Sequence, residues 1–122
     1  MTVQKVTDLL VWQRAMQLVQ EVYRLTLPVD ERRGLTAQLR RAAISVPSNI
    51  AEGQGRRSSS EFRHHLSIAH GSLLEVETEI AIAGRLRYIT DKQVESFLQL
   101  SAEVGRLLNG LYRSLPPRRD AH

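Results

Sequence analysis

The sequence predicts an all-α protein, an antiparallel up-down-up-down four-helix bundle. Apolar residues recur at helical spacing in four successive segments, the connections between these segments are short, and none shows the alternation typical of strands. At 122 residues the chain has the length of one domain. We expect a flexible N-terminus over residues 1–7, a bundle over 8–115 and a disordered tail over 116–122. The expected helices are 8–26, 30–54, 59–86 and 91–115.

The first helix has a wide apolar face. One inward line, spaced by four and three, consists of Val11, Ala15, Leu18, Val22 and Leu25. A second line beside it consists of Trp12, Met16, Val19 and Tyr23. Thr7 or Asp8 can cap the start, and Pro28 marks the end. Trp12 lies at the edge of this face, so it is either a core residue or an anchor of an interface between copies.

The second helix contains a proline within "RRAAISVPSNIAEG", residues 40–53. It is expected to start at the acidic pair Asp30-Glu31, which suits the positive end of a helix dipole. Pro47 in a helix interior costs about 3 kcal/mol or more. Either Ser45 caps a separate helix, or one helix is kinked at Pro47. Because the apolar positions keep helical phase across Pro47, we predict one kinked helix, with Ser45 and Asn49 bonding nearby backbone groups.

The third and fourth helices carry start signals in sequence. Ser58 and Glu61 have the spacing of a capping box, and Thr90 is followed three residues later by Gln93. The third helix then has the clearest apolar period in the chain, with Phe62, Leu66, Ala69, Leu73, Val76, Ile80 and Ala83. The inward face of the fourth consists of Val94, Phe97, Ser101, Val104, Leu108, Leu111 and Leu115.

An antiparallel hairpin between the second and third helices predicts specific contacts. If its turn centres near residue 57, paired positions sum to about 114. Arg40 or Arg41 then faces Glu75, and Asn49 faces His65. We predict that Arg41 and Glu75 form an ion pair inside the bundle or at its rim. Loss of one partner from a buried pair costs about 3–5 kcal/mol.

Composition limits the class of protein. The chain has no cysteine, so disulfides, thiolate metal sites and cysteine nucleophiles are excluded. We see no secretory signal and no apolar run of the ~20 residues that span a bilayer, so we expect a cytoplasmic location and no membrane partner. The net charge is +4, and only Lys5 and Lys92 among the cationic residues are lysines. This arginine bias favours nucleic-acid binding, and genomic base composition is the alternative explanation.

Arginines gather in two parts of the sequence, and we expect them to contact nucleic acid. The candidate residues are Arg32, Arg33, Arg40, Arg56, Arg57 and Arg63. Phosphate contacts of this kind weaken steeply with salt. Aromatic residues are not interleaved with these arginines, so no base-stacking platform is expected. The binding predicted here depends on the shape and backbone of structured RNA or DNA.

The sequence offers only weak candidates for a catalytic or metal-binding site. Arg57 and His64 have the loose spacing of some helical ribonucleases, in which a histidine moves protons and an arginine holds the phosphate. An RNA-cleaving enzyme is therefore the alternative to a binding protein. Glu61 and His64 form a single Glu-x-x-His pair, whereas bundle di-iron sites need two such pairs. We expect no catalytic residue, no metal site and no cofactor.

Three stretches of the sequence resemble a known family. "VWQRAMQLVQEVY", "GLTAQLRRAAISVPSNIAEGQGRRSSSEFRHHLSIAHGSLLEVETEI" and "LRYI" are similar to the bacterial four-helix-bundle proteins encoded in intervening sequences of large-subunit (23S) ribosomal RNA genes. The resemblance covers roughly residues 8–115. Two departures are Leu27-Pro28, where the family often has Phe-Pro, and Arg33, where it has an aromatic residue.

The resemblance implies a closed ring of five copies with no established enzymatic activity. The same group includes accessory proteins of diversity-generating retroelements, which implies a reverse transcriptase or another protein as a partner. We therefore expect a non-enzymatic homo-oligomer that binds structured RNA or DNA or serves as a scaffold. A protein-protein scaffold with incidental positive charge is the remaining alternative.

Overall fold

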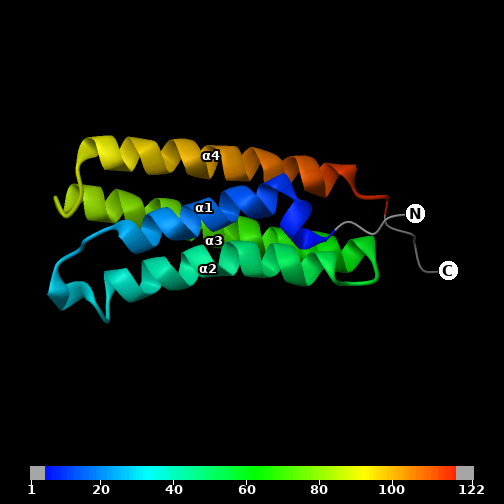
Figure 1. Ribbon diagram of the computed structural model, residues 1–122, viewed down its shortest axis with the longest axis horizontal. Coiled ribbons are helices and arrows are strands. Elements are labelled where there is room, and N and C mark those ends of the chain that lie inside the picture. Colours follow the sequence, from blue (N-terminus) through cyan, green and yellow to red (C-terminus); the bar gives the residue numbers. More distant parts are fainter. Residues whose placement is uncertain (1–4, 118–122) are drawn as a thin grey trace.

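The computed structural model describes residues 5–117, which form a bundle of four antiparallel helices (Figure 1). The helices are α1 (Leu10–Arg24), α2 (Leu35–Gln54), α3 (Ser59–Arg85) and α4 (Asp91–Ser114). Each helix packs against two others, so that α2 and α4 both lie between α1 and α3. No strand occurs within residues 5–117. The predicted all-α up-down-up-down bundle is confirmed.

Aliphatic side chains fill the core, as the shortage of aromatic residues requires. The largest fully buried apolar side chains are Leu18, Leu39, Val46, Ile50, Leu66, Leu73, Val76, Ile80, Val104 and Leu108. Each of these contributes roughly 1.5–3 kcal/mol through burial. Those of α1, α3 and α4 belong to the inward lines that the apolar spacing predicts, and Leu39, Val46 and Ile50 are the apolar positions that keep helical phase across Pro47.

The starts of α1 and α2 differ from prediction. Neither Thr7 nor Asp8 caps α1, because both belong to a short 3-10 helix, η1 (Val6–Asp8), ahead of it. The acidic pair Asp30-Glu31 likewise lies in a separate 3-10 helix, η2 (Val29–Glu31). α2 begins at Leu35, after the non-helical Gly34. Glu31 still serves α2 from outside, since its Oε1 accepts a hydrogen bond from the Leu35 backbone N–H at 3.3 Å.

The two ends of the chain were predicted to be flexible. Val6 and Thr7, within the predicted N-terminal segment 1–7, belong to the 3-10 helix Val6–Asp8. Residues 1–4 and 118–122, which make up most of the rest of these two segments, lie outside the described residues. No helix of the described chain is long and apolar enough to cross a membrane.

α2 runs without interruption through Pro47, which is buried. The alternative of two helices is therefore wrong, and the prediction of one helix is confirmed; a bend at Pro47 stays a prediction. The Asn49 side-chain Nδ2 donates a hydrogen bond to the Ser45 carbonyl at 2.9 Å, as expected for polar side chains beside the proline. Asn49 thus bonds the backbone one turn earlier, across Pro47, whereas within residues 5–117 the Ser45 hydroxyl bonds only the side chains of Asn49 and Ser72.

The starts of α3 and α4 agree with their sequence signals. The Ser58 hydroxyl accepts a hydrogen bond from the Glu61 backbone N–H at 3.1 Å. Thr90 and Gln93 form a complete capping box, in which each side chain accepts from the backbone N–H of the other residue. These caps fix where the two longest helices begin.

Candidate nucleic-acid interface

The candidate arginines lie at opposite ends of the bundle. Arg32 and Arg33 precede α2, whereas Arg56 and Arg57 follow it (Figure 1). A helix of 20 residues is about 30 Å long, so the two groups do not form one continuous surface. Arg32, Arg33 and Arg57 are exposed, and within residues 5–117 none of the three has a hydrogen bond or ion pair. Their guanidinium groups are available to phosphates.

Two other candidate arginines are engaged by neighbouring side chains. The Arg40 guanidinium lies over the Tyr23 ring of α1, 4.4 Å from its centroid, and its Nε is buried without a hydrogen-bond partner. Arg56 Nη2 donates to Glu52 Oε1 at 2.7 Å, one turn earlier on α2. Arg40 is therefore positioned as a packing residue between α1 and α2, and the charge of Arg56 is partly neutralised.

Arg63 links α3 to the end of α4. Its Nη2 donates to the backbone carbonyls of Leu115 at 2.7 Å and Pro116 at 2.6 Å, which are free at a helix C-terminus. The same guanidinium lies 5.7 Å from the centre of the Tyr112 ring. Aromatic residues are not interleaved with these arginines in the sequence, but the fold brings Tyr112 of a different helix beside Arg63.

A groove runs between α3 and α4 beside Tyr112, and we call it the α3–α4 groove. It consists of two adjoining depressions of about 430 and 360 Å³ that share Ser67 and Tyr112. The floor of the larger depression is apolar, with the buried Leu66 and Leu108. Polar and cationic side chains line the rest of the groove, namely His70, Arg106 and Asn109 in the larger depression and Ser60, Arg63 and His64 in the smaller.

The sequence did not lead us to the α3–α4 groove, although a signal was present. Arg106, Asn109 and Tyr112 follow one another at intervals of three on α4, so they share one face. Ser67 and His70 have the same interval on α3. Two polar faces of this kind on neighbouring helices are what the groove brings together.

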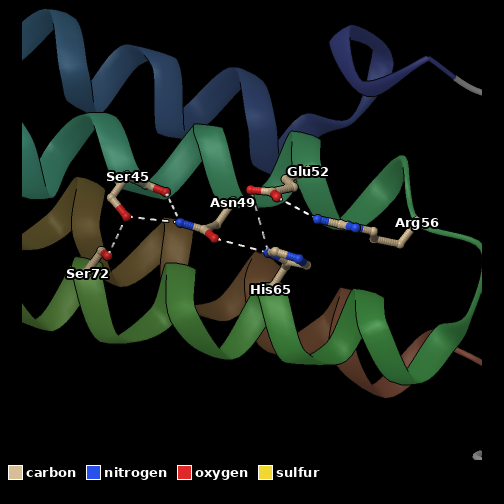
Figure 2. A network of polar contacts seen from close by, with 6 residues as sticks. All are labelled: Ser45, Asn49, Glu52, Arg56, His65 and Ser72. Atoms are coloured by element: carbon tan, nitrogen blue, oxygen red, sulfur yellow. Dashed lines mark hydrogen bonds and ion pairs between the residues drawn. The ribbon is translucent and has the colours of Figure 1, made fainter.

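The contact between α2 and α3 is of a different kind, and we call it the α2–α3 seam. Figure 2 shows a chain of polar contacts along it. Ser72 Oγ donates to Ser45 Oγ at 2.8 Å, and Asn49 Nδ2 donates to the same Ser45 oxygen at 3.0 Å. Because the Asn49 amide group is turned toward Ser45, its Oδ1 faces His65 Nδ1 at 3.2 Å. His65 therefore carries a proton on Nδ1, and the predicted pairing of Asn49 with His65 is confirmed.

Arg41 and Glu75 lie across the α2–α3 seam from each other, but the predicted ion pair is absent. Both line a polar depression of about 380 Å³, and both are exposed. Within residues 5–117, no ion pair or hydrogen bond connects Arg41 with Glu75. Because both side chains reach solvent, water replaces the direct contact at little cost.

Glu79 lines the same depression and is its most constrained group. The side chain is only 9% exposed, and its Oε1 has no hydrogen-bond partner. Burial raises the pKa of the Glu79 carboxyl, and the nearby charge of Glu75 raises it further. Within residues 5–117 Glu79 forms no ion pair, and Glu77 accepts a hydrogen bond from Ser101 at 2.7 Å.

The structure gives the reactive candidates no shared site. Arg57 lies in the turn before α3 and the exposed His64 lies within α3, with no recorded contact between them. His64 makes an edge-on ring contact with His65. Among residues 5–117, no group of three or more His, Asp or Glu side chains could hold a metal ion.

Trp12 is partly buried and packs against the core. Val19, Leu100 and Leu107, which widen the apolar faces of α1 and α4, also pack there. Other large apolar side chains remain exposed on α2, α3 and α4. They include Ile44, Ile68, Leu74, Ile82 and Leu98, each about 40–50% exposed. The partial burial of Trp12 fits its use as a core residue, one of the two roles that the sequence left open.

Comparison with known proteins identifies one family, and several chains of solved structures are similar to this chain. The family model of the 23S rRNA-intervening sequence proteins matches residues 7–110. A crystal structure of a protein of unknown function from the S23 ribosomal protein family of Bacteroides thetaiotaomicron is similar, with a TM-score of 0.78 and 26% sequence identity. The similarity covers 86% of this chain and 100% of that one. No curated protein is similar enough to this chain to count as a match.

Proposed function

Because the chain belongs to the 23S rRNA-intervening sequence protein family, we propose that it is a non-enzymatic, homo-oligomeric protein that binds structured RNA or DNA. The observation that carries this proposal is the set of unpaired arginines at the bundle ends, Arg32, Arg33 and Arg57. An exposed guanidinium without a carboxylate partner can bind a phosphate bidentately. The protein acts in the cytoplasm, either alone on the nucleic acid or as a scaffold for a partner such as a reverse transcriptase.

The distribution of charge supports binding through the ends. Acidic residues cluster in the middle of α3 at Glu75, Glu77 and Glu79. Glu75 and Glu79 line the depression between α2 and α3, where their carboxylates would repel phosphates, whereas Glu77 faces Ser101 of α4. Nucleic acid is therefore directed to the ends, where its backbone can follow more than one subunit.

Exposed apolar residues support self-association. Ile44, Ile68 and Ile82 each leave about two-fifths of their surface to solvent on helices that otherwise pack tightly. A heterologous contact repeated around a closed ring would bury such residues. Five copies, as the resemblance implies, would place five sets of end arginines on each rim of the ring.

A salt series of binding to a structured ribosomal RNA fragment tests the proposal. We expect binding at low salt. In a plot of the logarithm of the association constant against the logarithm of the salt concentration, the slope should become shallower by about 0.7–0.9 for each phosphate contact removed. The variant Arg57→Gln should reduce this slope. Arg24→Gln is the matched control, because the Arg24 guanidinium is already held by Glu21 at 2.8 Å.

Three results would contradict the proposal. Absence of RNA or DNA binding at low salt would favour the protein-protein scaffold instead. Light scattering after size-exclusion chromatography should give about five times the subunit mass of 13.8 kDa, and a monomer would refute the ring. Cleavage of labelled RNA that disappears in His64→Ala would show that the chain is an enzyme.

A further inference from the structure

We propose that the α3–α4 groove binds single-stranded nucleic acid, with one unpaired base stacked on Tyr112. This inference rests on the proposed function and names a second, distinct contact for the same ligand. The groove and the arginines at the bundle ends recognise different parts of a nucleic acid. The ends offer charge to any phosphate backbone, whereas the groove offers a surface for a base.

The first argument is the ring of Tyr112. It is 40% exposed at the point where the two depressions meet. The Arg63 guanidinium lies near the ring, and that guanidinium is itself held by the carbonyls of Leu115 and Pro116. Tyr112 is therefore held in place before any ligand arrives. A preorganised aromatic surface loses little side-chain freedom when a base stacks on it.

The second argument is the lining of the groove. Among residues 5–117, no Asp or Glu side chain lines either depression, although the chain carries 13 acidic residues. Arg106, His64 and His70 supply nitrogen donors for phosphate oxygens, and none of them forms an ion pair within residues 5–117. Asn109 supplies a donor and an acceptor suited to the edge of a base. Such a lining favours a polyanion and disfavours a cationic peptide.

The third argument is the shape of the groove. Gly105 lines the larger depression, and its lack of a side chain leaves space there above the buried Leu66 and Leu108. Each depression lies in the size range of ligand pockets, ~300–1,000 Å³. Both are open along the helices, which suits a continuous strand. A base within a duplex is already stacked and paired, so it cannot reach Tyr112 without being extruded.

Fluorescence anisotropy with labelled single-stranded oligonucleotides of RNA and of DNA tests the inference at low salt. Tyr112→Ala should weaken binding about 5- to 100-fold, the range found when a stacking aromatic is removed. Tyr112→Phe keeps the ring and should stay within about twofold of wild type. The matched control is Tyr23→Ala, because Tyr23 is 45% exposed and also has an arginine over its ring, but lies on α1.

The outcomes separate this inference from the proposed function. The groove proposal is supported if Tyr112→Ala is the only tyrosine variant that loses affinity for single strands and its binding of duplex RNA is unchanged. If Arg57→Gln weakens binding and Tyr112→Ala does not, the groove is wrong and the proposed function stands. Equal losses in Tyr112→Phe and Tyr112→Ala, or in Tyr23→Ala, would also overturn the stacking contact. If the wild-type protein binds neither single strands nor structured RNA, both proposals fail.

Discussion

α3 makes two contacts of opposite character along its length. Toward α2 it forms the α2–α3 seam, where Asn49 joins helix to helix through hydrogen bonds (Figure 2). Toward α4 it borders the α3–α4 groove, where glycine and exposed polar side chains leave space. The same helix thus packs closely against α2 through hydrogen bonds and borders an open groove beside α4. Stability should depend on the first side and ligand binding on the second.

The close approach of α2 and α3 has a local cause. Gly53 has no Cβ, and a Cβ added there would lie 2.8 Å from His65 Cβ and 2.9 Å from Phe62 Cδ1. A Cβ added at Gly105, beside the α3–α4 groove, would meet only Leu73 Cδ2, at an ordinary 3.6 Å. Glycine is required at the first position by packing, and at the second it is not.

The largest expected effect is that of removing the amide at the centre of the α2–α3 seam. Asn49→Ala eliminates hydrogen bonds to Ser45 and to His65, and it leaves the half-buried His65 Nδ1 without its acceptor. We expect a loss of about 2–3 kcal/mol in the free energy of unfolding. Urea denaturation followed by circular dichroism measures it.

Asn109→Ala is the matched control for this prediction. Asn109 is exposed beside the α3–α4 groove, and no hydrogen bond of its side chain is recorded within residues 5–117. Its replacement should change stability by no more than about 0.5 kcal/mol. Equal losses at both positions would mean that the α2–α3 seam is not the more strongly bonded contact.

The next effect compares the same substitution at two glycines. Gly53→Ala should cost about 1–2 kcal/mol, because the added methyl group overpacks the contact with His65 and Phe62. Gly105→Ala should instead stabilise the protein by about 0.5–1 kcal/mol, since alanine favours the helix and meets no close neighbour. Thermal melts of both variants measure the difference, and shifts of the same sign would contradict it.

The fold and one side of α3 could be predicted from the sequence, and the other side could not. Apolar periodicity identified the inward faces, and a single estimate of turn position then paired Asn49 with His65 correctly. That pairing works because a short hairpin turn fixes the register of α2 and α3. The same estimate of turn position was less accurate for Ser45. Paired positions that sum to 114 would place it opposite residue 69, whereas Ser45 contacts Ser72, about one helical turn away.

The α3–α4 groove depends on information that periodicity does not contain. Arg63 and Tyr112 belong to helices whose relative rotation and lateral register decide whether their exposed faces adjoin. Periodicity assigns exposed residues to the solvent without saying which neighbour they border. The start of α2 was missed for a local reason, since Gly34 interrupts the helix between the acidic pair and Leu35.

The smallest expected effect concerns the carboxyl buried beside the α2–α3 seam. Burial and the charge of Glu75 raise the pKa of Glu79 in the folded state. A raised folded pKa means that Glu79 stabilises the fold only when it is protonated, and this contribution is lost as the pH rises through the folded pKa. Glu79→Gln cannot ionise, so it should be more stable than wild type at pH 7, by less than about 1 kcal/mol.

The pH dependence is what separates this explanation from a simple change in packing. The advantage of Glu79→Gln should shrink as the pH falls from 7 to 4, because the wild-type carboxyl then becomes protonated and neutral like the amide. Glu95→Gln, at an exposed position on α4, provides the control for the change in net charge. Melting temperatures of both variants across this range measure the effect. If the stability advantage of Glu79→Gln were constant with pH, the introduced amide would pack or hydrogen-bond better than the carboxyl, and ionisation would not be the cause.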